Sequence, residues 1–542
     1  MLVREDLAMA YIRNIILKPI FLSLTLFFAC SSSQAVHLDW SGQFWFDNHW
    51  LNNYQLNRSK PGYDADPDYY NTGGPYVPGA GEKNVIWFSA FMKLKPKVVV
   101  NDSIILKSEW HVGSPIYGFM GRDFPNSGGE QYNFTGSQKN GAAITAARFW
   151  ANLITDFGTI EIGRAPIHWG LGAIWNSGDN LYDRYQSSGD MVRLVAKFGS
   201  ITVSPAIVKV SMGNSVAGAL DTSSATTSFP SVVNPKEGND DVTDYQIAAK
   251  YENTEEDFDF GMMWDRRVGN KAQSGLLLSP TGSGSKKLNF NLFDFYVKKK
   301  LSRFTLGLEI PFYTGVVGGI DGSANDFKYS SLAVIVEASY TSDQWDIALK
   351  GGRVPGQPVT NASGQNVTTI DTGTKYRAIY LHKNYGLGLI MFKYNLYGLG
   401  ANNPDTQSAS SLRSPYDNPI VNANYVSLSP TFKLDKWAFH ATFLGAWAME
   451  SVPNEAGKVF YNHHRRTFHT VATNSGSQSS FMGWEMDYGV AFKWDDNFVA
   501  DWEVGLFFPG KYYNFANRSW PNHELGSTNF MFASQIRAGI TF

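Results

Sequence analysis

The sequence predicts an all-β protein, a transmembrane antiparallel β-barrel, on three observations. Strand-like runs alternate apolar and polar residues, so that one face suits lipid and the other a wet lumen. These runs are joined alternately by very short turns and by long polar loops. Aromatic residues make up 15% of the 542 residues and glycine contributes 51, as expected for aromatic girdles on many strands joined by turns. Because backbone groups in hydrocarbon must all be paired, such a sheet has to close on itself.

The connections set the expected number of strands. Long loops are expected near residues 52–83, 113–141, 165–189, 213–240, 269–286, 316–326, 356–371, 399–420, 451–479 and 511–526. Short turns are expected near Asn101, Asp156, Gly199, Asn253, Ser302, Ser342, Asn384, Asp435 and Asp495. The two kinds alternate, which predicts about twenty strands, within a range of roughly 16 to 22. Short turns are expected on the periplasmic side and long loops on the extracellular side.

The N-terminus reads as an export signal. Basic residues precede an apolar run at 20–29, and Ser33–Ala35 fits a small-x-small cleavage site, so residues 1–35 are predicted to be a signal peptide. Residues 36–542 are then a single barrel domain. The only cysteine, Cys30, lies in the signal, so the exported chain carries no disulfide. A lipoprotein signal ending at this cysteine is the alternative.

Composition excludes several classes of function. The net charge of −2 provides no basic field for nucleic acid. No apolar run approaches the length of a transmembrane helix beyond the signal. No motif indicates a cofactor or a metal, and the glycine-rich stretch after His168 matches no phosphate-binding pattern.

Translation could also begin at Met9, which would give a more ordinary basic start to the signal peptide.

The last strand shows the alternation most clearly. Phe530, Phe532, Ile536, Ala538, Ile540 and Phe542 share one parity, and Met531, Gln535, Arg537, Gly539 and Thr541 share the other. The first set is predicted to face lipid and the second the lumen. A strand that ends the chain on Phe542 resembles the assembly signal of outer-membrane barrels. This resemblance implies an outer-membrane location and the barrel assembly machinery as a partner.

The same alternation predicts charged residues in the lumen. The candidates include Lys107, Glu109, Glu485, Asp487, Asp501, Glu503 and Arg537. Acidic and basic candidates are balanced over the chain, so they predict no ring of one sign. Asp487 and Glu503 fall on neighbouring strands, where like charges repel unless Arg537 on the next strand bridges them.

The stretch from Arg148 to Pro205 contains the hairpin and the long loop on which the predicted pore depends. It contains FGTIEIGR followed by a long glycine-rich loop at 165–189. This order resembles the general porins of Gram-negative outer membranes, in which a hairpin ending in Gly-Arg precedes a loop that folds into the pore. The resemblance implies that acids on the loop face bases on the wall. The acids would be Asp179, Asp183 and Asp190, and the bases Arg148, Arg164 and Arg193.

Two features of this stretch leave alternatives open. The loop could instead be an ordinary surface loop whose carboxylates are solvated. Arg164 shares its parity with Ile160 and Ile162, so it would face lipid with them. Either a bulge at Gly163 turns Arg164 inward, or Arg164 lies at the headgroup rim.

The resemblance implies a passive channel for small polar solutes, without enzymatic activity. The alternatives are a surface binding or adhesion barrel with an occluded lumen and, less favoured, a barrel enzyme. The partners expected are outer-membrane lipid and lipopolysaccharide, which the basic run Asn462–Arg466 could touch, and small polar solutes. A homotrimer is one assembly that we consider.

Overall fold

The structure is a computed structural model of the 542-residue chain. It describes residues 37–53, 84–113, 144–211, 242–269, 288–318, 326–361, 374–394, 396, 416, 418–455, 457–463, 467–471, 477–514 and 529–542. The predicted signal peptide at 1–35 and residues 464–466 of the basic run lie outside these described residues.

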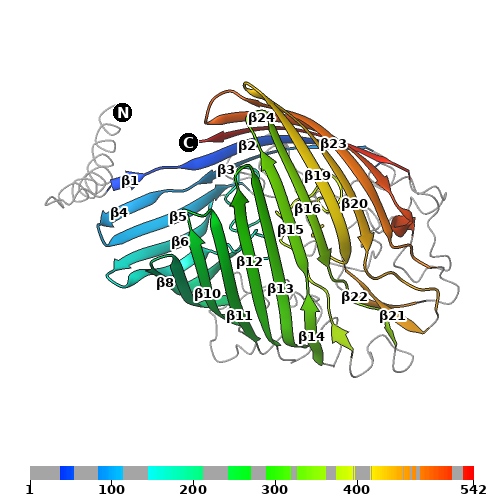
Figure 1. The fold of residues 1–542 in the computed structure, drawn as a ribbon, viewed down its shortest axis with the longest axis horizontal. Helices are drawn as coiled ribbons and strands as arrows, with labels where there is room; N and C mark the ends of the chain where they lie inside the picture. Colours follow the sequence, from blue (N-terminus) through cyan, green and yellow to red (C-terminus); the bar gives the residue numbers. More distant parts are fainter. Residues whose placement is uncertain are drawn as a thin grey trace, which may run out of the picture.

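The described strands form a closed antiparallel barrel (Figure 1). Its strands are β1 (His37–Asp39), β2 (Gly42–Asn52), β3 (Asn84–Leu94), β4 (Lys97–Asn101), β5 (Ile104–Val112), β6 (Ile144–Thr155), β7 (Gly158–Pro166), β8 (Ser188–Phe198), β9 (Ile201–Ser211), β10 (Val242–Asn253), β11 (Phe258–Gly269), β12 (Leu288–Leu301), β13 (Phe304–Gly318), β14 (Asp326–Leu332), β15 (Val334–Thr341), β16 (Trp345–Val354), β18 (Lys375–Tyr376), β19 (Ala423–Leu434), β20 (Trp437–Ala448), β23 (Phe481–Lys493), β24 (Phe498–Pro509) and β25 (Met531–Thr541). Closure comes from β2, which pairs with β3 on one side and with β25 on the other.

Several short strands continue one another along the barrel wall. β1 leads into β2, β3 into β4, and β14 into β15, while the two-residue β18 only extends the edge of β14. Counted in this way, the wall has 18 strands. This number lies within the predicted range and is two below the central estimate.

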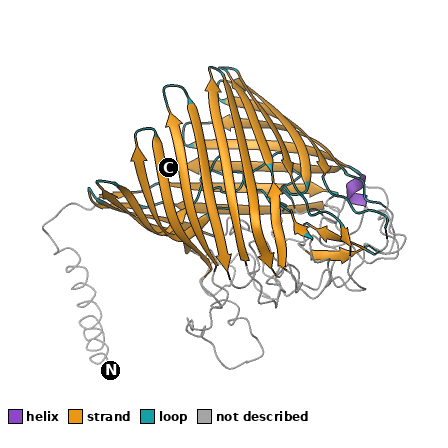
Figure 2. Ribbon diagram, turned by 60° about the horizontal axis from the view of Figure 1, so that its bottom comes forward, coloured by secondary structure: helices purple, strands orange, loops and turns teal. Residues whose placement is uncertain are grey.

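The strand ends that are joined by short turns lie at one end of the barrel, and the strand ends that flank the longer connections lie at the other (Figure 2). At the long-connection end, β17 (Thr360–Asn361), β21 (Lys458–Asn462) and β22 (Thr467–Thr470) form a separate small sheet. A 3-10 helix, η4 (Lys511–Asn514), follows β24. No helix in the described part of the chain is long and apolar enough to cross a membrane.

The two faces of the wall differ in the way that the alternation predicts. Ile536 of β25 and Phe542, which directly follows this strand, are each 50% exposed, whereas Gln535 is buried on the inner face. On β23, Trp484 is exposed and Glu485 is buried. An apolar exterior around a polar interior is the arrangement of a barrel that stands in lipid.

The prediction of two strands on either side of Asn384 is wrong. Residues 377–394 form no strand and follow a path inside the barrel, and β16 pairs directly with β19. Apolar residues of this segment, such as Ile390 and Met391, are fully buried against inner-wall residues such as Leu444. Residues of both parities are buried here, since the consecutive residues Leu389 to Phe392 are all buried, so the apolar run marks burial inside the lumen. This difference accounts for the two strands by which the estimate of twenty exceeds the observed wall.

Candidate pore constriction

The connection between β7 and β8, residues 167–187, crosses the lumen. On one side, Lys93 Nζ of β3 donates a hydrogen bond to the Gly178 carbonyl at 2.7 Å. On the other, Trp169 Nε1 donates to the Asp294 carbonyl of β12 at 3.3 Å. The strands β3 and β12 lie on opposite sides of the barrel, so this segment, which we call the first inner segment, spans it.

Glycine allows this segment to approach the wall closely. Gly170 has a φ of 57°, in the left-handed region that L side chains seldom adopt. A Cβ at this position would also stand 2.5 Å from Oε2 of Glu309 on β13. The same carboxylate oxygen accepts a hydrogen bond from the Leu171 amide. Glu309 therefore holds the entry of the first inner segment to the wall, a role that sequence analysis did not predict.

Residues 377–394, the second inner segment, are held by two carboxylates of β23. Glu485 accepts hydrogen bonds from the amides of Ile390 and Met391, each at 2.6 Å. Asp487 accepts one from the Leu389 amide at 3.0 Å. Sequence analysis predicted both acids as lumen residues, and the structure gives them this role. These contacts satisfy backbone donors that have no strand partner.

The far end of the second inner segment reaches β2 and β25. Lys393 Nζ donates to Gln535 Oε1 at 2.7 Å, and the Tyr394 hydroxyl contacts His49 Nδ1 at 2.8 Å. His49 Nε2 also contacts the hydroxyl of Tyr416 at 3.0 Å. The segment thus extends from β23 to the strands that close the barrel.

The two inner segments contact each other. The His382 amide donates to the Ala173 carbonyl at 2.7 Å. Asn384 makes two hydrogen bonds to the backbone of Tyr185. A single layer inside the lumen is therefore built from chain portions about two hundred residues apart, as the separation of 199 between Asn384 and Tyr185 shows.

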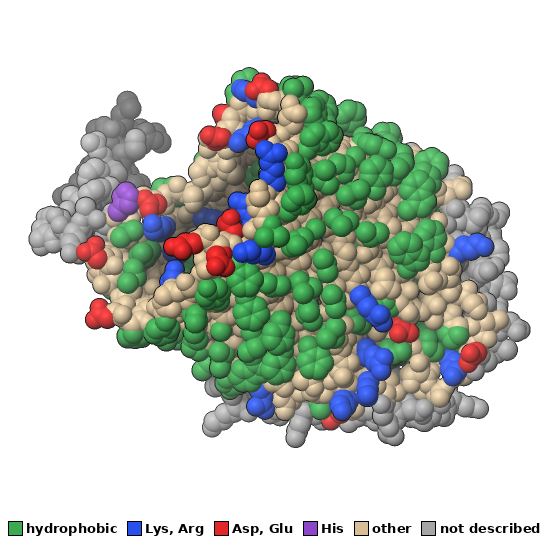
Figure 3. All heavy atoms as spheres, viewed as in Figure 1, with side chains coloured by type: hydrophobic (Ala, Val, Ile, Leu, Met, Phe, Trp, Pro, Cys, Tyr) green, Lys and Arg blue, Asp and Glu red, His purple; other side chains and the backbone are tan. Residues whose placement is uncertain are grey.

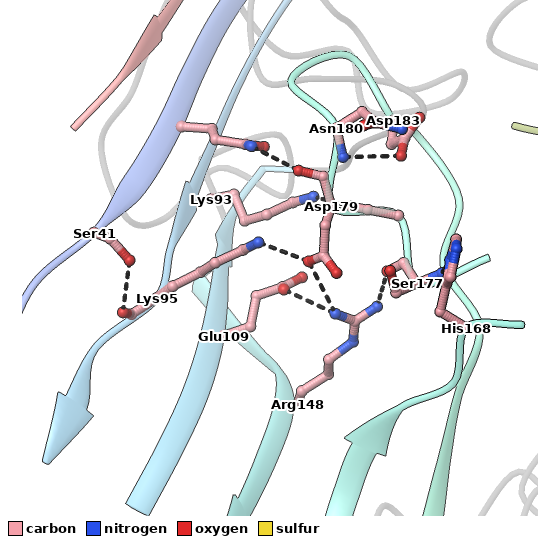
Figure 4. A network of polar contacts seen from close by, with 12 residues as sticks. Ser41, Lys93, Lys95, Glu109, Arg148, His168, Ser177, Asp179, Asn180 and Asp183 are labelled. Carbon is pink, nitrogen blue, oxygen red and sulfur yellow. Dashed lines mark hydrogen bonds and ion pairs between the residues drawn. The ribbon is translucent and has the colours of Figure 1, made fainter. Parts of the chain in front are cut away.

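Asp179 and Arg148 are brought together (Figure 4). The Asp179 carboxylate lies 2.7 Å from Lys95 Nζ and 3.7 Å from Arg148 Nη1. Burial alone would raise the pKa of Asp179, but the hydrogen bond from Lys95 and the charge of Arg148 hold it below its usual range. Arg148 also contacts Glu109 Oε2 at 3.1 Å and the Ser177 carbonyl. These charges are therefore paired directly and do not face each other across open solvent.

Asp183 makes a local contact. Its Oδ2 accepts a hydrogen bond from the Asn180 amide at 3.0 Å. Burial is the main cause that raises the pKa of Asp183 above its usual value. Within the described part of the chain, no ion pair joins Asp183 to a lysine or an arginine.

Arg164 and Asp190 lie elsewhere than predicted. Their side chains pair at 2.7 Å and are 52% and 44% exposed. They share the outer face with Ile162 and Val192, which are 43% and 53% exposed. The pairing of β7 runs without a register shift through Gly163, so no bulge turns Arg164 inward. This pair is outside the lumen, because the parity of the strand is kept.

Two further residues that were predicted to face the lumen, Arg193 and Lys107, contact neighbouring side chains of the wall. Arg193 Nε donates to Glu161 Oε2 at 2.6 Å, and Lys107 Nζ lies 5.9 Å from the centre of the Trp150 ring.

Arg537 bridges two acids of β24, contacting Asp501 at 2.7 Å and Glu503 at 3.1 Å. Asp487, which was considered as the other partner of this bridge, binds the second inner segment instead.

The first inner segment itself carries a cation, Arg184, which was not among the predicted site residues. Arg184 contacts Asp47 of β2 and lies 4.2 Å from the centre of the Tyr416 ring. Arg537 similarly lies 4.4 Å from the Tyr182 ring. The sequence Tyr182–Tyr185, with two aromatic residues around an acid and a base, was the available signal for these stacked contacts.

This chain is similar to known proteins in its fold but not in its sequence. Neither a scan against protein-family models nor a search of curated proteins found a match. Among solved structures, Pseudomonas aeruginosa OccK9 (OpdG) matches at 11% identity and a TM-score of 0.42, over 93% of this chain and 99% of that chain. Pseudomonas aeruginosa OpdK with vanillate matches at 9% identity and a TM-score of 0.43, over 93% and 98%. Outer-membrane expressed OmpT of Vibrio cholerae matches at 10% identity and a TM-score of 0.34, over 94% and 99%.

Proposed function

We propose that this protein is an outer-membrane channel for the passive diffusion of small polar solutes. The observation that carries the proposal is the contrast between the two faces of the wall. Aromatic and aliphatic side chains such as Trp502 are exposed outside, whereas Asp47, Glu109 and Arg148 are buried inside. A closed sheet with an apolar exterior and a charged interior suits a water-filled passage through lipid.

The orientation and location follow the same reasoning. The short turns would face the periplasm and the long connections the outside, as in other barrels of this kind. Residues 1–35 would direct export and be removed. The inner segments would narrow a lumen that 18 strands otherwise leave wide.

The second candidate is a binding barrel with an occluded lumen, and one observation favours it. Apolar side chains of the second inner segment, including Ile379, Leu389 and Met391, are buried in a cluster with the inner wall. A dense apolar layer inside the lumen could block the passage of ions. A barrel enzyme is the third candidate, and no contact described above supports it specifically.

Single-channel conductance separates the first two candidates. We expect the purified protein in planar bilayers to show discrete ohmic steps. Replacing residues 170–186 by a short Gly-Ser linker should raise the conductance of these steps, because it removes material from the lumen. Ser302→Gly in the two-residue turn at 302–303 serves as the control, since it changes a hairpin at the rim only and glycine accepts the φ of 57° at this position.

Two results would contradict the channel. If the protein is silent and conducts only after the replacement, the occluded barrel is correct. If the protein is recovered in soluble periplasm and shows no heat-dependent gel mobility, the membrane location itself is wrong.

A further inference from the structure

Four exposed basic residues lie together on the outer face of the barrel. They are Lys328 of β14, Arg353 at the end of β16, Lys375 of β18 and Arg377. In Figure 3, blue side chains form a column at the lower right, over the region where Figure 1 shows β14 and the end of β16. We call these four residues the outer basic patch.

Strand parity establishes that Lys328 and Arg353 point outward, Lys375 lies directly opposite Lys328, and Arg377 is an exposed residue that follows β18. Arg353 shares its face of β16 with Trp345 and Leu349, both 43% exposed. Lys328 shares its face of β14 with Leu332, which is 47% exposed, while Tyr329 between them is fully buried. The patch is therefore continuous with the apolar exterior and belongs to the end of the barrel with the long connections.

The patch contains an unfavourable arrangement of charge. β14 and β18 pair in parallel, with Lys328 directly opposite Lys375. Like charges in this position repel and destabilise a sheet unless an anion compensates them. No residue of the patch forms an ion pair within the described part of the chain, although Asp326 lies two positions before Lys328 on the same face. Glu450 also interacts electrostatically with Arg377.

We infer that the outer basic patch binds the phosphate groups of a membrane lipid. A phosphate supplies the missing negative charge, and Arg353 and Arg377 offer planar donors that fit phosphate oxygens in pairs. The acyl chains of the same lipid would cover the neighbouring apolar face at Leu332 and Leu349. A free anion would satisfy only the first requirement, so the combination points to a lipid of the leaflet at the long-connection end. The inference rests on the proposed membrane location.

The test measures lipid binding by the purified full-length protein in nonionic detergent. The probe is fluorescent diphosphorylated lipid A, with its monophosphorylated and dephosphorylated forms for comparison. The patch variant carries Lys328→Gln, Arg353→Gln, Lys375→Gln and Arg377→Gln. We expect its affinity for the diphosphorylated lipid to fall by at least about tenfold, since each cation near a membrane surface adds measurable attraction. Wild-type affinity should fall with each phosphate removed.

A control for total charge removes four exposed cations at the other end of the barrel, where Lys298 and Lys300 share the inward parity of Asp294. It carries Lys197→Gln, Lys298→Gln, Lys300→Gln and Arg303→Gln, near the short turns at 199–200 and 302–303. This control should bind the lipid as the wild type does. If the patch variant does not assemble, as judged by heat-dependent gel mobility, the pair Lys328→Gln and Lys375→Gln is used instead.

Three outcomes would overturn the inference. They are equal affinity in wild type and patch variant, equal loss in patch variant and control, and full displacement of the lipid by millimolar inorganic phosphate. The patch variant should conduct as the wild type does. A protein that binds lipid A through the patch but does not conduct would contradict the proposed channel and leave this inference intact.

Discussion

Asn384 and Tyr185 are joined by a reciprocal pair of hydrogen bonds. Asn384 Nδ2 donates to the Tyr185 carbonyl at 2.6 Å, and the Tyr185 amide donates to Asn384 Oδ1 at 3.1 Å. A side-chain amide can satisfy both the backbone N–H and the backbone carbonyl of one residue in this way, whereas a carboxylate or a methyl group cannot. The pair locks the first inner segment to the second within the lumen.

Replacing Asn384 by alanine should loosen the two inner segments. Loss of both hydrogen bonds at this partly buried site should cost about 1 to 2 kcal/mol of local stability. We expect more frequent current fluctuations in single-channel recordings at constant mean assembly. The matched control is Asn253→Ala, which removes an asparagine that also binds two backbone amides, those of Glu255 and Glu256, but at a short turn. Equal current noise in both variants would contradict the lock.

Replacing Glu485 by alanine should release the second inner segment. Two backbone amides lose their acceptor, and a buried unpaired amide is costly enough to displace the segment. Conductance should rise, and a protease should cleave near 387–391 faster than in the wild type. Glu161→Ala is the control, because this inner-face acid accepts a hydrogen bond from Arg193 of β8 at 2.6 Å, and no described contact joins it to an inner segment. Unchanged conductance together with unchanged cleavage would show that the segment does not depend on this carboxylate.

Neutralising Asp179 should shift ion preference toward anions. Asp179→Asn leaves Lys95 and Arg148 without this partner, so the potential in the lumen rises. The shift in reversal potential under a salt gradient should be larger at low salt, where screening is weaker. Asp190→Asn is the control, since its ion pair with Arg164 lies on the outer face. If the reversal potential shifts equally in both variants, the ion preference does not depend on Asp179 in the constriction.

Ion preference should also depend on pH through Lys393. Burial, reinforced by the positive charge of Arg537, lowers the pKa of Lys393 to about 8. Its ammonium is charged below this pKa and neutral above it, so anion preference should fall as the pH rises from about 7 to about 9. Lys393→Arg should remove this dependence, because arginine stays charged throughout. A pH profile identical in wild type and variant would assign the titration to another group.

Deleting Phe542 should lower the amount of assembled barrel. Its amide and carbonyl bond to Gly42 at 3.1 Å and 2.7 Å, at the seam where the barrel closes. The fraction of protein that shows heat-dependent gel mobility should fall several-fold, while Phe542→Tyr should assemble normally. If the deletion variant assembles as well as the wild type, the prediction that Phe542 promotes barrel assembly is wrong.

Local sequence determined which face of the wall each residue occupies. Side-chain direction in a strand alternates with a period of two, so the parity of Ile536 and Gln535 could be read without a neighbour. The same parity predicted the outward direction of Arg164, and the alternative of a bulge at Gly163 is the part that the structure does not follow.

Only the tertiary structure decided what fills the lumen. A short apolar run looks the same in a strand of the wall and in a segment buried against the wall, so residues 377–394 could not be told from strands. The partners of Glu485 lie about 95 positions away, as the separation from Ile390 shows, and no local pattern encodes such a contact. Pairing of Asp179 with Lys95 depends equally on where the first inner segment folds. Contacts of this kind form only when the barrel closes and brings distant residues together. The interactions of the whole fold, and not those of the local chain, offset the entropic cost of closing such long loops.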